Sequence, residues 1–270
     1  MRRVDPGSKG GRMTGRVTLV GGGPGREDLL TLAGARALAD ADVVLFDRLA
    51  PHERLHELAP GAELVDVGKR PGHHAVPQHE IEALLVEHAL AGRHVVRLKG
   101  GDPYVLGRGS EEVLACHAAG VPVEVIPGVT SAVAVPGAAG IPLTHRGVSH
   151  LFTVVSGHAP LTETELEHLA GLGGTIVVLM GVNSLPSLTA GLARYGMPAQ
   201  MPVAIIERGF RPDQRTTIGD LADIVVSAGR ARVASPAVVV VGEVVRLAHD
   251  GDAGAAELME RAAGFTAVAR

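Results

Sequence analysis

Short apolar runs recur along the first half of the chain, and helical patterns separate them. The runs lack polar alternation, which is typical of strands covered on both faces of a sheet. The segment "EDLLTLAGARALADA" begins with acidic residues, and "PQHEIEALLVEHALAG" has Pro77 near its start and Gly92 just past its end, as helices often do. This alternation predicts a mainly parallel sheet through residue 135, with strands at 17–20, 43–46, 95–98 and 123–126.

A second series of apolar runs follows a break in this rhythm. The segment "PGAAGIPLTHRGVSH" (136–150) is rich in proline and glycine and carries a basic pair, so it predicts a domain boundary. Thr162 and Glu165 have the spacing of a capping box at a helix start. Two domains also suit a chain of 270 residues. We expect a mobile tail over 1–15, an N-terminal α/β domain over 16–138, a C-terminal α/β domain over 139–250, and a helix or tail over 251–270. The apolar runs predict strands of the second domain near 151–157, 175–180, 203–207 and 237–242.

Composition and charge exclude several classes of protein. A net charge of −4, four Phe, two Tyr and no Trp supply neither the positive field nor the stacking surfaces typical of nucleic-acid binding. The single cysteine, Cys116, can form neither an internal disulfide nor a cysteine-based zinc site, which predicts a cytoplasmic protein. No apolar run approaches the roughly 18 residues of a membrane span. We therefore expect no nucleic-acid partner and no membrane anchor.

Glycine-rich bends follow the predicted strands, where ligands of α/β proteins gather. The bend "GGGPG" (21–25) lacks the third glycine of the dinucleotide fingerprint, which would fall on Arg26. Pro24 also removes a backbone donor, so the bend favours close approach of a ligand over anion binding; a plain tight turn is the alternative. Asp47 follows the second strand and either holds a ligand or caps a helix.

The stretch "VRLKGGDPYVLGRGSEE" (96–112) runs from a strand into two glycine bends. Asp102 occupies a turn with Pro103, and Arg108 lies between glycines, where it packs poorly but can reach a carboxylate with both guanidinium nitrogens. Complementation of a helix dipole alone could explain Glu111 and Glu112. Lys69 and Arg70, between glycines after another strand, either face a ligand or are solvated.

A group of histidines and an adjacent Cys–His pair suggest a metal site and a nucleophilic pair, but the sequence supports neither. His73, His74 and His79 lack a carboxylate or cysteine at ligand spacing, so we expect no metal. Cys116 and His117 are adjacent in a helix, where side chains diverge, and cannot act as a nucleophile and base. Cys116 is expected in the core.

Taken together, "VGGGPG", "FDRLA", "VGKR", "RLKGGDPYVLGRGSEE", "PGVTSA", "GIPLTHRGV", "LMG" and "SPAVVVVGEVV" resemble the tetrapyrrole methylases over roughly residues 16–247. The order of "GGDP", "GRG", "GKR" and "THR" is most similar to members that methylate uroporphyrinogen III. The resemblance implies two α/β domains flanking a cleft for S-adenosylmethionine, a homodimer, and transfer of two methyl groups to carbons 2 and 7 of the macrocycle. The product would be precorrin-2, by way of precorrin-1.

The resemblance also implies residue roles. Asp47 and Lys69 match a proton acceptor and a proton donor, and Arg108, Glu111 and Arg146 match residues placed against the macrocycle. The matching cofactor contacts are Pro24, Gly100, Gly101, Asp102, Val105, Thr130, Ser131, Met180 and Gly209. Arginines at 70, 108 and 146 would give this acidic chain the positive surface that a polycarboxylate substrate needs.

The expected chemistry requires no metal and no covalent intermediate, because a dry cleft that aligns the reactants within about 3–3.5 Å suffices. The proton that leaves the ring goes to Asp47 or Glu111, since arginine is a poor base. Two departures affect local substrate contacts: Arg26 stands where the family usually has Asp, and Ala138 where it usually has an aromatic residue. The alternatives are a methylase of RNA or of a later corrinoid, a dinucleotide-dependent oxidoreductase, and a regulator that binds S-adenosylmethionine without turnover.

Overall fold

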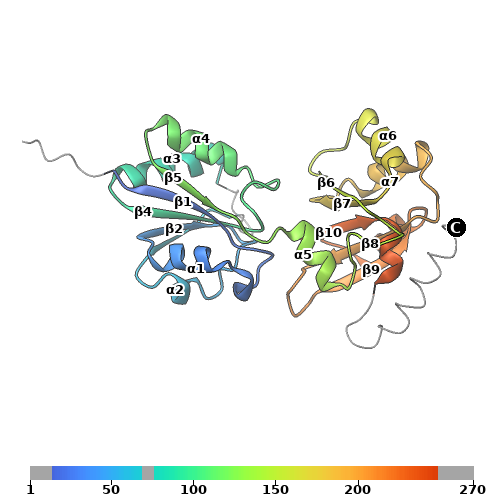
Figure 1. Cartoon of the computed structure of the whole chain (residues 1–270), viewed down its shortest axis with the longest axis horizontal. Coiled ribbons are helices and arrows are strands. Elements are labelled where there is room, and N and C mark those ends of the chain that lie inside the picture. The colour runs from blue at the N-terminus through green and yellow to red at the C-terminus, as the bar shows by residue number, and fades with distance from the viewer. Residues whose placement is uncertain (1–13, 69–75, 249–270) are drawn as a thin grey trace, which may run out of the picture. The chain divides into compact units, whose positions relative to one another are not determined.

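A computed structural model of the chain describes residues 14–68 and 76–248. Its internal contacts divide these residues into two compact units (Figure 1). The first contains the described residues up to Gly23 and from Glu27 to Gly128, and the second contains Pro24–Arg26 and those from Val129 onward. The expectations for the two ends of the chain fall almost entirely outside the described residues.

The first unit contains, in the described part of the chain, a five-stranded parallel sheet of order β3-β2-β4-β1-β5. The four apolar runs named from the sequence form β1, β2, β4 and β5, so the predicted parallel sheet is confirmed. The carboxyl ends of parallel strands share one edge, which brings the five following loops to the same side. The strands are β1 (Arg16–Gly21), β2 (Val43–Phe46), β3 (Glu63–Asp66), β4 (His94–Lys99) and β5 (Val123–Ile126).

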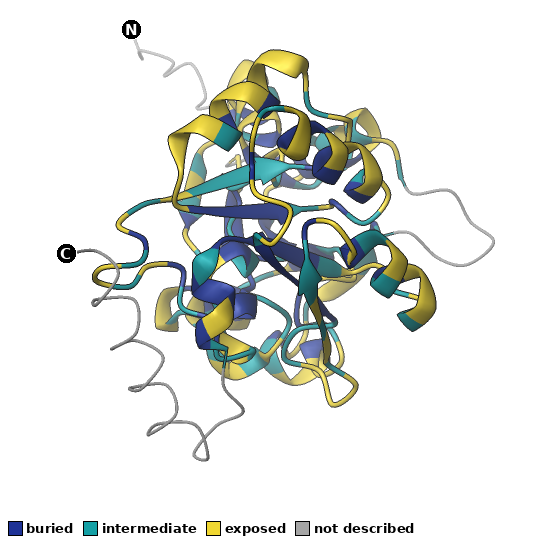
Figure 2. Ribbon diagram, turned by 90° about the vertical axis from the view of Figure 1, so that its right-hand side faces the viewer, coloured by how far each residue is buried: buried dark blue, intermediate teal, exposed yellow. Residues whose placement is uncertain are grey.

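Helices cover both faces of this sheet, which explains the absence of polar alternation in its strands. The helices α3 (Gln78–Leu90) and α4 (Gly109–Ala118) pack on one face, with Ile81 and Leu85 against Val17 and Val95. The helices α1 (Leu32–Ala39) and α2 (Leu55–Leu58) cover the other, and a short 3₁₀ turn, η1 (Glu27–Leu29), precedes α1. Cys116 is fully buried on α4, as expected. Figure 2 shows the same layering, with buried strands between helices whose outer faces are exposed.

The second unit holds a mixed five-stranded sheet of order β6-β7-β10-β8-β9 within the described residues. Only β6 and β7 are parallel, and the other three pairings are antiparallel. A parallel or mixed sheet was predicted here, so the fold class is confirmed, although β9 was not foreseen. The strands are β6 (Phe152–Ser156), β7 (Thr175–Leu179), β8 (Pro202–Glu207), β9 (Arg215–Asp220) and β10 (Ala237–Val241).

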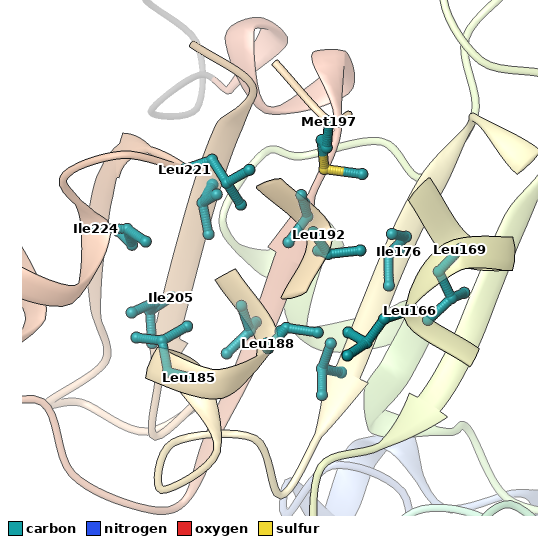
Figure 3. Packing of buried hydrophobic residues seen from close by; sticks show 14 of the residues in the cluster. Leu166, Leu169, Ile176, Leu185, Leu188, Leu192, Met197, Ile205, Leu221 and Ile224 are labelled. Atoms are coloured by element: carbon teal, nitrogen blue, oxygen red, sulfur yellow. The ribbon is translucent and has the colours of Figure 1, made fainter. Parts of the chain in front are cut away.

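Two apolar clusters cover the faces of this second sheet. On one face, α6 (Glu163–Leu172), α7 (Leu185–Arg194) and α8 (Ile224–Ala231) contribute the leucines and isoleucine that pack on Ile176 and Ile205 (Figure 3). The predicted capping box of Thr162 and Glu165 opens α6. On the other face lie α5 (Ser131–Ala138) and the 3₁₀ helix η2 (Glu243–Leu247).

Helix α5 packs on the second sheet, so the division between the two units lies earlier in the chain than the sequence predicted. Its Ala132 and Val135 are buried with Val177, Val238 and Val240 of the second sheet. The observed division therefore falls between residues 128 and 129, ahead of α5, whereas the sequence placed it after residue 138. The proline and glycine residues at 136–140 mark the end of a helix that already packs on the second sheet.

Glu207, at the end of β8, should make the acid stability of the second unit depend on pH. Its buried carboxylate accepts hydrogen bonds from Arg215 Nη2 (2.9 Å) and the Ala234 N–H (3.0 Å). Burial raises the pKa of Glu207, but these donors outweigh it, so the pKa lies below its ordinary value of 4.5. A carboxylate whose pKa is lower in the folded state than in the unfolded state stabilises the fold at pH values above its unfolded-state pKa. This stabilisation is lost as the pH falls through the folded-state pKa.

We expect thermal unfolding temperatures to fall from pH 5 towards pH 3 more steeply in the wild-type protein than in Glu207→Gln. The matched control is Glu124→Gln, which changes an exposed carboxylate of β5 and should keep the wild-type slope. Equal slopes for Glu207→Gln and the wild type would contradict the assignment.

Candidate active site at the carboxyl edge of the parallel sheet

Four glycines bring the loops after β1, β4 and β5 into backbone contact. The N–H groups of Gly23 and Gly101 donate to each other's carbonyl oxygens, at 3.1 and 2.7 Å. A Cβ atom at Gly128 would lie 2.4 Å from the Gly101 oxygen, and one at Gly21 would lie 2.3 Å from the Gly128 nitrogen. Gly101 also has φ +69°, which disfavours side chains. Gly21, Gly101 and Gly128 thus form a junction, called here the glycine junction, that only glycine can build.

Asp102 fixes the loop after β4 against the loop after β5. Its Oδ2 accepts a hydrogen bond from the Gly128 N–H at 3.1 Å, and its Oδ1 accepts one from the Tyr104 N–H at 2.8 Å. Val105, half-buried in the same loop, donates its N–H to the Asp102 carbonyl at 3.3 Å. The predicted cofactor residues 100–102 and 105 therefore lie in one loop that the glycine junction and Asp102 hold in place.

Asp47 ties the loop after β2 to the same place. Its Oδ1 accepts hydrogen bonds from the N–H groups of Leu49 (3.0 Å) and Ala50 (3.2 Å), and both of its oxygens lie 3.3 Å from the Gly100 nitrogen. The side chain is 26% exposed. Asp47 thus caps a turn, whereas the alternative considered above was a helix cap, and it also presents a carboxylate at the edge of the sheet beside Gly100.

Arg108 and Glu111, both predicted to face the substrate, are paired with each other. Arg108 Nε and Nη2 donate to the two Glu111 oxygens at 2.9 and 2.6 Å. This bidentate pair raises the pKa of Arg108 and lowers the pKa of Glu111. Both side chains are about half exposed, at 57% and 47%. A carboxylate of a ligand would therefore compete with Glu111 for Arg108.

The predicted contacts in the second unit gather around α5 and the loop after β8. Thr130 caps α5 by accepting the Ala132 N–H at 3.3 Å, and Ser131 is the first residue of that helix. Gly209 packs so closely on Val135 of α5 that a Cβ would lie 2.6 Å from its Cγ2. Phe210 belongs to the same apolar cluster as Leu179, which precedes Met180.

Backbone strain marks these same loops of the second unit. Met180, Arg208 and Phe210 have φ values of +61°, +50° and +65°, a conformation that side chains seldom adopt. Such strain costs on the order of 1–3 kcal/mol a residue and gathers at functional sites. The strained positions enclose Gly209 and include Met180, two of the residues predicted to contact the cofactor.

The remaining predicted residues are placed as follows. Pro24 belongs to the second unit, together with Arg26, whose guanidinium carbon lies 5.7 Å from the centre of the Phe210 ring. Arg146 is exposed in a tight turn closed by hydrogen bonds between His145 and Ser149. The Ala138 carbonyl accepts a hydrogen bond from Gln214 at 3.3 Å. Lys69, Arg70, His73 and His74 lie outside the described residues.

Sequence reasoning missed a buried ionic cluster beside Asp47. Arg97 and Lys99 of β4 are buried and both pair with the buried Glu112 of α4, and Arg97 also forms an ion pair with Asp47. The available signal was two cations at alternate positions of an otherwise apolar strand, which places both on one face of the sheet. Glu112 was attributed only to the helix dipole.

Two further observations concern ligands and membranes. Over the described ranges, no three His, Cys, Asp or Glu side chains are grouped closely enough to hold a metal ion. The helices in those ranges are also all too short or too polar to cross a bilayer.

The fold and this edge of the sheet define a class of protein. Residues 16–225 match the family of tetrapyrrole (corrin/porphyrin) methylases, and the chain belongs to that family. A relative from Methanosarcina barkeri, an S-adenosyl-L-methionine-dependent uroporphyrinogen III methyltransferase, is 48% identical over 87% of this chain and 94% of its own length.

Solved structures agree with this assignment. Uroporphyrin-III C-methyl transferase from Thermus thermophilus, complexed with S-adenyl homocysteine, is 46% identical, with a TM-score of 0.73 over 86% of this chain and all of that one. Cobalt precorrin-4 methyltransferase is 26% identical, with a TM-score of 0.75 over 85% of this chain and 95% of that one. The fold is therefore similar in both, whereas the sequence resembles the uroporphyrin enzyme far more.

Proposed function

We propose that the chain is an S-adenosylmethionine-dependent methyltransferase that adds two methyl groups, at carbons 2 and 7, to uroporphyrinogen III and yields precorrin-2 by way of precorrin-1. The structural observation that carries the proposal is the glycine junction, where backbone from three loops meets without side chains beside Asp47 and Asp102. Relatives with the uroporphyrinogen activity in their names support this substrate over a later corrinoid.

The residues fit S-adenosylmethionine, which when bound supplies an electrophilic methyl group. In the first unit, Gly100, Gly101, Asp102 and Val105 offer backbone groups on a loop held rigid by the glycine junction. In the second, Thr130, Ser131, Met180 and Gly209, with Pro24, would hold it through backbone and neutral side chains. Because glycines leave backbone amides accessible, close approach of a ligand requires no rearrangement of side chains.

The ring must lose a proton after methyl transfer, so this site must contain a base. Glu111 is the weaker choice, because Arg108 lowers its pKa and occupies both of its oxygens. Asp47 retains an exposed edge and receives its hydrogen bonds from backbone N–H groups that stay fixed. We therefore assign proton acceptance to a carboxylate oxygen of Asp47 and expect Lys69 to act as the proton donor.

Arginine side chains would grip the polycarboxylate substrate. Arg108 can exchange Glu111 for a substrate carboxylate with the same bidentate geometry, and Arg146 is exposed in its turn. We also propose a cytoplasmic homodimer with no membrane partner, as the family resemblance and the single cysteine suggest. The net charge of −4 and the scarcity of aromatic residues further favour a protein that does not bind nucleic acid.

The test supplies freshly reduced uroporphyrinogen III and S-adenosylmethionine and weighs the product. We expect a mass increase of two methyl groups, and none when the methyl donor is omitted. Methylation of a later corrinoid but not of uroporphyrinogen III would replace the proposed substrate. Binding of S-adenosylhomocysteine without any turnover would favour a regulator, and tight binding of a nicotinamide cofactor would favour the oxidoreductase.

A further inference from the structure

The buried ionic cluster joins three charged side chains, from β4 and α4, and contacts Asp47 in the loop after β2. Glu112, fully buried on α4, accepts a hydrogen bond from Arg97 Nε at 3.0 Å and two from Lys99 Nζ, both at 3.0 Å. Gln78, at the start of α3, adds a longer one at 3.4 Å. The side chains of Arg97 and Lys99 are only 5% exposed. Arg97 Nη2 lies 3.7 Å from Asp47 Oδ2.

Among the ion pairs of the described residues, the charges of this cluster balance when Asp47 is counted. Arg97 and Lys99 bring two positive charges into a buried region where Glu112 supplies one negative charge, so a second carboxylate is required for neutrality. Uncompensated charge away from water is costly, and Asp47 is the partner that Arg97 reaches. Burial and then Arg97 lower the pKa of Lys99, while Glu112 and Asp47 act in the opposite direction.

The cluster is also rigid, because its cations have fixed partners. Arg97 Nη1 donates to the backbone carbonyl of Leu98 at 2.9 Å, while its Nε is held by Glu112. Its Nη2 therefore has little freedom to move relative to the edge of the sheet. A carboxylate at Asp47 meets a guanidinium on one side and the Gly100 N–H on the other.

We propose that Arg97 and Lys99, held by Glu112, are positioning residues for Asp47: they hold its carboxylate in place beside Gly100, where it can accept the proton. This inference rests on the function proposed above. It assigns no contact with substrate or cofactor to the three buried residues. Their loss should therefore lower the rate of the chemical step and leave binding of the methyl donor intact.

The experiment measures kcat, and KM for S-adenosylmethionine, in Glu112→Gln, which keeps the size of the side chain and removes its charge. We expect kcat to fall by about tenfold to a hundredfold, the effect of a small misplacement of a reacting group, with KM for the donor within about threefold. Cys116→Ala is the matched control: it removes a buried atom one turn further along α4, outside the cluster, and should lower stability without lowering kcat.

A double-mutant cycle separates positioning from general damage. In an Asp47→Asn background, adding Glu112→Gln should lower kcat no further, because the group that it positions is already gone. An equal additional loss in that background, or unchanged kcat in Glu112→Gln, would overturn the proposal. If Glu112→Gln does not fold, Lys99→Met provides the same readouts. Lys99→Met removes one buried positive charge, whereas Glu112→Gln leaves two buried cations without their shared carboxylate. An inactive wild-type protein would instead refute the proposed function.

Discussion

Asp47→Asn is expected to lower kcat by about 10²–10⁴-fold, the range that a general base contributes, while calorimetric binding of S-adenosylhomocysteine stays within about threefold. The variant keeps one acceptor oxygen for the N–H groups of Leu49 and Ala50. Its new amide group would place N–H donors against the Gly100 N–H, which already donates there, and against the Arg97 guanidinium. We therefore also expect a loss of about 1–3 kcal/mol in the free energy of unfolding.

The control for Asp47→Asn is Glu124→Gln, the same chemical change at an exposed position of β5 in the same unit. It should leave both kcat and stability near their wild-type values. Single-turnover transfer, followed by product mass, measures the chemical step directly. An Asp47→Asn protein that methylates at more than half the wild-type rate would remove Asp47 from the mechanism.

Gly128→Ala is expected to disrupt the glycine junction and with it cofactor binding. The added methyl group would lie 2.4 Å from the Gly101 oxygen and 2.6 Å from the Gly21 carbonyl carbon. These are backbone atoms, so a side-chain rotation cannot relieve the contact. We expect a loss of about 3 kcal/mol in the free energy of unfolding, the upper end for overpacking, and affinity for S-adenosylhomocysteine at least tenfold weaker.

Gly229→Ala is the matched control for Gly128→Ala. Gly229 lies within α8, and a Cβ there would meet nothing within 4 Å. Replacing a helical glycine by alanine should raise stability by about 0.5–1 kcal/mol and leave binding unchanged. Urea unfolding and calorimetry measure both quantities. Wild-type stability in Gly128→Ala would show that the junction tolerates a side chain.

The elements of the fold were predictable where apolar runs are buried on both faces. The runs at 43–46 and 123–126 match β2 and β5 residue for residue. The edge strand β9 was missed because "RTTIGD" is mostly polar and pairs on one side only, with β8. The domain boundary was placed too late because α5, with Pro136 inside it, resembles a connecting segment.

The sequence indicated which loops and residues make up the candidate site, and their roles stay predictions, but the internal geometry of the site could not be predicted. Glycine bends after strands indicated close backbone approach, yet which glycines meet depends on strand order, which places β1 between β4 and β5. The pairing of Arg108 with Glu111 follows from their spacing along the chain and could have been anticipated. The link from Glu112 to Asp47 could not, because it passes through β4 to a residue 65 positions earlier in the chain.

The charged positions of β4 also restrict how its sheet can assemble. Arg97 and Lys99 alternate with Val96 and Leu98, which face the apolar layer formed with Leu38 and Leu55. Slippage of β4 by one residue would turn both cations into that apolar layer and away from Glu112. Mispaired sheets are thus penalised during folding by the same charges that serve the finished protein.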